Sequence, residues 1–155
     1  MTDGVFYALR VRDVMEKRPP TLPPDASICT VARKLRRTGH VWIVDSQQGR
    51  KVCGIITEKD LFDLVSPLPE KTYTTTSIRP LRLAHIEVVH ASEFMVRPVV
   101  SCSPDNTLEE ALALMEERRV RNISVMDGDN LQGEISLHCV IEQYILTSCV
   151  RQDTA

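Results

Sequence analysis

The strongest constraint on the fold is that the chain repeats itself, because two segments about eighty residues apart carry the same pattern. Met15 corresponds to Met95, and Asp25 corresponds to Asp105, each at an offset of 80. Two further pairs of blocks follow in the same order, 41–45 with 123–127 and 54–57 with 133–136. Ordered blocks separated by small length changes are hard to obtain by chance. The chain is therefore expected to fold as two similar halves.

Both halves predict the same order of elements. The hydroxyls of Ser27 and Thr107 can accept hydrogen bonds from free backbone N–H groups, so a helix is expected to begin at each. Apolar residues then recur at helical spacing. Two short β-branched runs with a turn between them predict a hairpin, and an apolar helix closes each half. The expected hairpins span 41–57 and 122–136, and the expected closing helices span 58–65 and 137–146.

The repeat divides the chain into two copies and a connection. We expect a mixed α/β fold with residues 9–66 as the first repeat, 67–90 as a linker and 91–150 as the second repeat. Halves of about 60 residues are marginally stable alone, so they should bury surface against each other. The linker contains three prolines and three consecutive threonines. Its length of about 25 residues is long for a connection within a compact domain.

Composition excludes several classes of function. The formal net charge is −2 and the isoelectric point is near 6.1, so a basic face for nucleic acid is not expected. No run of about 18 apolar residues appears, which argues against a membrane span. The first residues lack the basic and apolar segments of a signal peptide. These features favour a cytoplasmic protein.

The five cysteines do not indicate a disulfide framework or a metal site. Their number is odd and none forms a Cys-x-x-Cys pair, so a structural zinc site is not expected. They are interpreted as small apolar residues in a reducing compartment, although a heat-adapted protein could still form one disulfide. The four histidines have no metal-ligand spacing with the acidic residues. With no activated nucleophile or acid–base pair in view, we expect no catalytic activity.

The repeated blocks together resemble the cystathionine-beta-synthase (CBS) domain family, from about Arg12 to Ile145. In the first copy the resemblance is carried by 13–15, 24–27, 44–45 and 54–61, and in the second by 93–95, 103–108, 125–127 and 133–136. It implies two pseudo-symmetric repeats, each a small sheet flanked by helices, packed sheet to sheet. It also implies a cleft for AMP, ADP or ATP, or for S-adenosylmethionine, and dimerisation into a flat disc.

The Thr57-x-x-Asp60 element is the primary candidate for binding the ribose. A ribose presents two adjacent hydroxyl donors, and an ionised Asp60 can accept from both. The Thr57 hydroxyl can serve a ribose or phosphate oxygen. N–H groups at the start of the following helix favour anionic groups nearby. The alternative is that Thr57 and Asp60 only cap that helix.

The second copy departs from this pattern. Ser136 stands at the Thr57 position, but Cys139 stands where the first copy has Asp60. A thiol is a weak donor and a poor acceptor, so the second ribose site is expected to be weak or empty.

Phosphate contacts are assigned from the resemblance. It implies that Arg121 and His138 of the second copy face the nucleotide held by Asp60, with His40 and Lys59 at the mirror positions. Each of these could instead be an ordinary solvated or partly buried side chain. Asn122 stands where the family often has arginine, which weakens phosphate binding there. Trp42 replaces the usual proline, and it either packs in the core or stacks on a base.

Two functions remain after these exclusions. The first is a sensor that binds an adenine nucleotide and signals to an unknown regulated protein. The second is an adaptor with a decayed nucleotide site that acts by dimerising and docking on a partner. In both, an apolar stripe on the last helix is expected to lie in the core or to form a dimer seam, and it comprises Leu137, Val140, Ile141, Tyr144 and Ile145.

Overall fold

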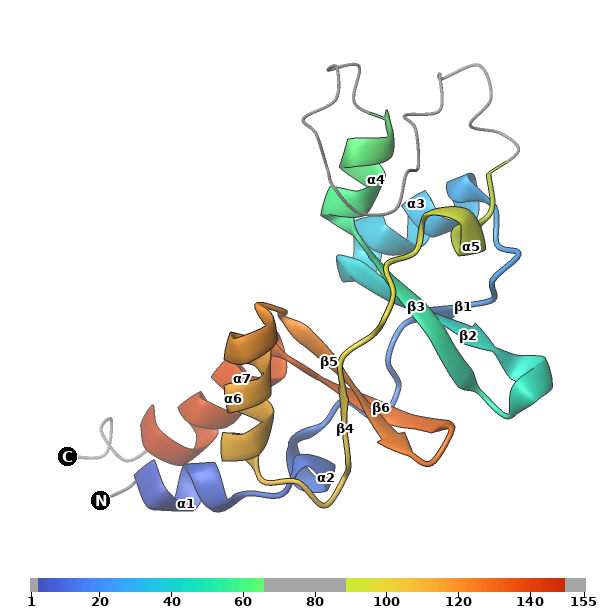
Figure 1. Ribbon diagram of the computed structural model, residues 1–155. Helices are drawn as coiled ribbons and strands as arrows, with labels where there is room; N and C mark the ends of the chain where they lie inside the picture. The colour runs from blue at the N-terminus through green and yellow to red at the C-terminus, as the bar shows by residue number, and fades with distance from the viewer. Residues whose placement is uncertain (1–2, 66–88, 150–155) are drawn as a thin grey trace. The chain divides into compact units, whose positions relative to one another are not determined.

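The computed structural model describes residues 3–65 and 89–149 and divides them into two compact units (Figure 1). Unit 1 contains residues 3–19 and 100–149, and unit 2 contains residues 20–65 and 89–99. Unit 1 therefore combines two separate stretches of the chain, whereas unit 2 lies within the single range 20–99. The first residues of each sequence repeat pack with the body of the other repeat, so the compact units are cut differently from the repeats.

Unit 2 is a three-stranded sheet with helices, formed mainly by the first repeat. Its strands lie in the order β1-β2-β3, with β1 parallel to β2 and β2 antiparallel to β3. The elements are β1 (Thr21–Leu22), α3 (Ile28–Thr38), β2 (His40–Asp45), η1 (Ser46–Gln48), β3 (Lys51–Thr57), α4 (Glu58–Val65) and α5 (Ala91–Phe94).

Unit 1 repeats the same plan and carries one further helix at its start. Its sheet has the order β4-β5-β6, with the same parallel and antiparallel pairings. The elements are α1 (Asp3–Ala8), α2 (Val11–Val14), β4 (Ser101–Cys102), α6 (Leu108–Arg118), β5 (Asn122–Asp127), β6 (Asn130–Ser136), α7 (Leu137–Tyr144) and the π-helical turn η3 (Ile145–Cys149). The predicted mixed α/β class with two similar halves is confirmed.

The two long helices begin where their caps predict. Ser27 accepts a hydrogen bond from the Thr30 N–H at 3.2 Å and starts α3. Thr107 accepts from the Glu110 N–H at 3.2 Å, and the Glu110 carboxylate accepts from the Thr107 N–H at 2.8 Å, which forms a capping box at α6. Both helices end on a left-handed residue, which is Gly39 in α3 and the less suited Arg119 in α6.

Each unit has its own apolar core between the sheet and its helices. In unit 2 the buried faces of α3, β2 and β3 meet Val89, at the end of the predicted linker, and Phe94 on α5. In unit 1 the faces of α6, β5 and β6 meet Phe6 and Val11 from the N-terminal stretch. These packed faces explain why the first residues of each repeat belong to the unit formed by the body of the other repeat.

A backbone contact on the last strand of each sheet fixes these stretches further. Glu16 exchanges two N–H···O bonds with Glu134 on β6, at 2.9 and 3.0 Å. Val96 makes the equivalent exchange with Ile55 on β3, at 2.8 and 3.2 Å. The incoming stretch can approach the strand this closely because a glycine precedes each of the two bonded strand residues, Glu134 and Ile55. A Cβ on Gly133 would lie 2.5 Å from the Glu16 carbonyl oxygen.

The structure corrects one detail of the expected elements. The closing helix expected over 137–146 is α-helical only to Tyr144 and continues as the π-helical turn η3. The stripe expected in the core or at a dimer seam divides: Val140 is buried in the unit 1 core, whereas Leu137, Ile141, Tyr144 and Ile145 are exposed. The sequence-predicted linker lies outside the described residues apart from 89 and 90.

Three further observations concern membrane, metal and disulfide chemistry. In residues 3–65 and 89–149, every helix is too short or too polar to cross a membrane. No group of three His, Cys, Asp or Glu side chains in this part of the chain could hold a metal ion. All five cysteines are described, and all are free thiols.

Candidate functional site

The turn from β3 into α4 brings the two predicted ribose ligands together. The Asp60 Oδ2 atom accepts from the Thr57 backbone N–H at 2.8 Å and from the Thr57 hydroxyl at 2.9 Å. Both side chains are half-buried. Asp60 Oδ1 takes part in neither bond. The helix-capping alternative is therefore formed in the structure, and it orients the carboxylate while leaving one oxygen outside these two bonds.

His40 lies beside this turn, at the start of β2. It pairs with Thr57 across the sheet, so the two residues are direct neighbours on adjacent strands. The His40 ring is 6.4 Å from the Trp42 ring in an edge-on arrangement. Trp42 itself is fully buried, which supports packing over stacking on a base. The structure thus places His40 next to the Thr57 of its own copy.

Lys59 has a partner on its own helix. Its ammonium group contacts the Asp63 carboxylate at 2.6 Å, one turn along α4. Both side chains are largely exposed. An exposed pair of this kind contributes little to stability, so Lys59 can exchange Asp63 for another anion at small cost.

The corresponding turn of unit 1, from β6 into α7, shows what the exchange of Asp for Cys changes. The Ser136 hydroxyl accepts from the Cys139 N–H at 3.1 Å and lies 3.2 Å from the Cys139 sulfur. Ser136 is buried and Cys139 is half-buried. This turn is capped by the hydroxyl of its first residue, not by a carboxylate three residues on, and it presents a thiol where unit 2 presents a carboxylate.

Arg121 and His138 flank that second turn. The Leu137 N–H donates to the Arg121 carbonyl at 2.9 Å, which ties the start of α7 to the residue before β5. In unit 2 the Glu58 N–H donates to the Gly39 carbonyl in the same way, at 3.2 Å. The side chains of Arg121 and His138 are both exposed. Asn122, the first residue of β5, pairs with Ser136 as His40 pairs with Thr57.

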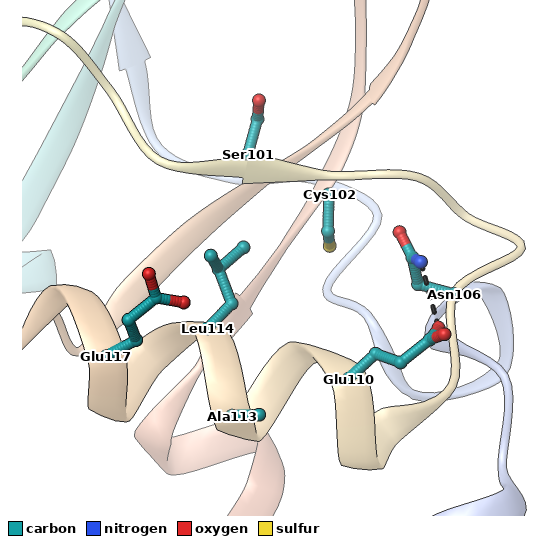
Figure 2. Close-up of a pocket in the computed structure, with 7 residues that line it drawn as sticks. All are labelled: Ser101, Cys102, Asn106, Glu110, Ala113, Leu114 and Glu117. Atoms are coloured by element: carbon teal, nitrogen blue, oxygen red, sulfur yellow. Dashed lines mark hydrogen bonds between the residues drawn. The ribbon is translucent and has the colours of Figure 1, made fainter.

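A shallow hollow in unit 1, between β4 and α6, was not predicted (Figure 2). Cys102 and Leu114 point into it, with Glu110 and Glu117 toward its two ends. Burial raises the pKa of Cys102 to about 11, so its thiol stays protonated at neutral pH. The hydrogen bond from Asn106, and then that from the Thr107 N–H, lower the pKa of Glu110, so its carboxylate stays ionised.

Glu134 is a second feature that the sequence analysis passed over. It is 4% exposed and lies in the middle of β6, opposite the fully buried Ser124. In unit 2 the equivalent pair is Trp42 and Ile55, which is apolar. The signal available in the sequence was a glutamate within a predicted strand. Charged side chains are seldom buried without partners, so its burial in the structure marks it as unusual.

The fold and the repeated turn agree with the comparisons to known proteins. The sequence matches the CBS domain family over residues 11–67 and again over 91–145. The chain therefore belongs to the CBS-domain family and contains a pair of these domains.

Individual relatives extend this result. The chain is 31% identical over 138 residues to protein sds23 of Aspergillus niger, covering 86% of this chain and 26% of that protein. It is 27% identical to the arabinose 5-phosphate isomerase KdsD of Yersinia pestis, covering 87% of this chain and 37% of that protein. The chain thus spans well under half the length of these relatives.

Solved structures show the same fold. The CBS-domain protein ATU1752 of Agrobacterium tumefaciens aligns with a TM-score of 0.69 at 26% identity, covering 89% of this chain and 95% of that one. The CBS domain pair of protein MJ0100, solved with 5′-methylthioadenosine and S-adenosyl-L-methionine, aligns with a TM-score of 0.67 at 21% identity, covering 88% and 96%.

Proposed function

We propose that this CBS pair is a regulatory module that binds an adenosine-containing ligand, with AMP, ADP or ATP expected first and S-adenosylmethionine as the alternative. Asp60 accepts from the ribose hydroxyls, and Thr57 orients the carboxylate and contacts the ligand. The proposal is supported by membership of the family and by the two adenosine compounds in the MJ0100 structure. Both compounds contain the ribose diol that a carboxylate recognises.

The observation that carries the proposal is the geometry of Asp60. Both intramolecular bonds end on Oδ2, which fixes the carboxylate against Thr57. Oδ1, whose two lone pairs take part in neither of these bonds, can then accept from both ribose hydroxyls. A carboxylate already held in place loses little side-chain entropy on binding, so the cap assists recognition.

The remaining site residues have supporting roles in the proposal. Arg121 and His138 are proposed to neutralise the phosphates of the ligand held by Asp60, and His40 and Lys59 are proposed for the mirror site. Ser136 remains in that second site, which is weak because Cys139 supplies no anionic acceptor. Both Arg121 and His138 are exposed, so binding an anion would cost neither side chain a buried contact.

The module is proposed to act by binding rather than by catalysis. Ligand binding would change the surface presented to a regulated protein, while exposed apolar residues of α7 would be covered by a second copy. Leu137, Ile141, Tyr144 and Ile145 are between 44% and 52% exposed, which favours a homodimer. The same surface supports the adaptor alternative, in which dimerisation and docking matter and no nucleotide binds.

Calorimetric titration of single variants tests the ligand site. Asp60→Asn removes the charge and one acceptor, and charged hydrogen bonds contribute about 1.5–3 kcal/mol, so binding should weaken by roughly 10–150-fold. The matched control is Asp63→Asn, three residues further along α4, which removes only the exposed pair with Lys59. The control should bind as the wild type does.

The stoichiometry provides a second readout from the same titration. One tight ligand per chain is expected, because only the first turn carries a carboxylate. Wild-type affinity retained in Asp60→Asn would place the ligand elsewhere. No heat with any adenosine compound at millimolar concentration would favour the adaptor.

A further inference from the structure

Strand β4 leaves one edge of the unit 1 sheet open. It pairs with β5 on one side, where Ser101 lies opposite Ser124 in a parallel ladder. The Ser124 N–H donates to the Val100 carbonyl at 3.0 Å, and in this pattern the N–H and C=O of Ser101 point away from β5. Within the described part of the chain neither group is hydrogen-bonded, and Ser101 is exposed. Such an edge is a template for a further extended segment.

The hollow between β4 and α6 lies along this edge. All of its lining residues belong to unit 1, and its volume is about 330 Å³. Figure 2 shows β4 running beside α6, with Cys102 and Leu114 between them and with Glu117 and Glu110 toward the two ends. Alternate side chains of an extended segment face the same way. A segment bonded to the β4 edge would therefore direct every second side chain over an apolar centre with a carboxylate at each end.

Both carboxylates can receive a cation. Glu110 accepts hydrogen bonds from the Asn106 amide at 2.9 Å and from the Thr107 N–H at 2.8 Å, and both end on Oε2. Its Oε1 atom takes part in neither bond. Glu117 has a 3.8 Å contact with its neighbour Arg118, and both of these side chains are exposed. A cation can thus approach either carboxylate without disrupting a buried contact.

The fold does not require this chemistry, because the other copy reverses it. Helices α3 and α6 begin at equivalent hydroxyl caps, so their positions correspond one to one. Glu117 corresponds to Arg37, and Leu114 corresponds to Lys34. The same flank of α3 is therefore basic and lacks the apolar centre. The acidic and apolar hollow is particular to unit 1.

We propose that the β4 edge and the hollow beside it dock an extended segment of the regulated protein with the pattern basic-x-apolar-x-basic. The apolar residue lies opposite Cys102 and covers Leu114, and the residue beside it pairs with the Ser101 backbone. The two basic residues reach Glu110 and Glu117. The contact with Ser101 is of the kind that Glu16 and Val96 make elsewhere in the molecule, where one residue bonds to a strand edge.

Helix and strand geometry set the spacing of the basic residues. Glu110 and Glu117 are seven positions apart on α6, which is about 10 Å along the helix axis. Residues four positions apart in an extended segment are about 13 Å apart. Arginine and lysine side chains are long enough to absorb the difference, and their aliphatic stems add apolar contact. The inference goes beyond the proposed function, because it specifies the partner segment and needs no nucleotide.

A designed peptide tests the site. The probe is the end-blocked, fluorescein-labelled peptide Thr-Arg-Thr-Leu-Thr-Arg-Thr, titrated with the full chain at about 50 mM salt and followed by fluorescence anisotropy. We expect a Kd below about 1 mM. The control peptide Thr-Thr-Arg-Leu-Arg-Thr-Thr has the same composition but turns both arginines to the opposite face. It should bind at least about fivefold more weakly, because its cations point away from the carboxylates.

A second control peptide tests the strand edge. N-methylation of the leucine and of the two threonines beside it removes the donors that either strand direction would offer to the Ser101 carbonyl. The charges and side chains stay the same. Binding should again weaken at least about fivefold, since a backbone hydrogen bond contributes about 1 kcal/mol.

Protein variants test the acidic end. Glu117→Arg should raise the Kd of the probe at least about fivefold, because an exposed attraction becomes a repulsion. The matched control is Glu116→Arg, which makes the same charge change at an exposed neighbour that does not line the hollow. It should bind the probe as the wild type does. A probe with glutamate in place of both arginines should prefer Glu117→Arg to the wild type. Circular dichroism checks that each variant is folded.

Nuclear magnetic resonance of the ¹⁵N-labelled chain locates the bound probe. The backbone amides of Ser101, Cys102 and Leu114 should show the largest shift changes. Largest changes at Thr57 and Asp60 would instead place the peptide in the ligand site and overturn the proposal.

The remaining outcomes are equally decisive. No binding at about 1 mM, equal binding of the two isomeric peptides, or equal losses in Glu116→Arg and Glu117→Arg would refute the docking site. If dilution of the chain alone moves the amides of Ser101 and Cys102, a second copy occupies the edge and the proposal is wrong. Asp60→Asn should bind the probe normally, so failure of this site and failure of the ligand site are distinguished.

Discussion

Gly54 and Gly133 show how single residues connect the two parts of each unit. Both lie one residue before the strand position that bonds to the incoming stretch. A Cβ on Gly54 would meet the Met95 side chain at 2.7 Å, and one on Gly133 would meet the Glu16 carbonyl oxygen at 2.5 Å. The repeated methionine and glycine are therefore explained by close packing of strand and stretch.

The consequences of adding a methyl group should differ between the two sites. Gly133→Ala pushes against backbone, which cannot move without losing the Glu16–Glu134 bonds, so we expect unfolding free energy to fall by about 2–3 kcal/mol. Gly54→Ala pushes against a flexible methionine and should cost about 1 kcal/mol. Urea denaturation measures both. A larger loss at Gly54 would contradict this explanation.

At the scale of elements, the sequence predicted the helices and strands that carry long periodic patterns. Helices α3 and α6 and the two hairpins carry clear periodicity, and the turn with Thr57 and Asp60 follows from the repeat. Strands β1 and β4 are only two residues long and leave no pattern to detect. Their pairing with β2 and β5 depends on tertiary contacts made by residues distant in sequence.

The sequence predicted only the part of the candidate site whose residues lie close together in the chain. Thr57 and Asp60 are three residues apart, so their contact follows from one turn of chain. The hollow beside α6 also depends on β4, and its glutamates resemble an ordinary solvated face in the sequence. The exchange of stretches between units was not predicted, because it requires knowing which core buries Val11 and which buries Phe94.

The exposed face of α7 gives a prediction about assembly. Ile141→Glu places a charge in the centre of the stripe formed by Leu137, Tyr144 and Ile145, and burying an unpaired carboxylate against apolar residues is costly. We expect the wild type to be dimeric at micromolar concentration and Ile141→Glu to be monomeric in light scattering.

The matched control is Val96→Glu, which adds the same charge to a side chain of unit 2 that is 46% exposed. It should remain dimeric. A dimeric Ile141→Glu protein would show that α7 is not covered in the assembly.

At the scale of the whole molecule, duplication has produced two units with one plan and different chemistry. Unit 2 has the carboxylate turn and the basic helix, whereas unit 1 has the thiol turn and the acidic helix. The asymmetry of the turns leads us to expect one strong ligand site per chain, which two identical repeats would not give.

The central claim is that the chain binds an adenosine-containing ligand, and its melting temperature tests this most directly. A ligand at 100 times its dissociation constant stabilises the folded state by about 2.7 kcal/mol, which for a chain of this size raises the melting temperature by roughly 5–10 °C. We expect such a shift with AMP, ADP, ATP or S-adenosylmethionine, a smaller one with GMP, and at most about half of it in Asp60→Asn at the same ligand concentration. No shift of the wild type with any of the adenosine compounds at millimolar concentration would contradict the account.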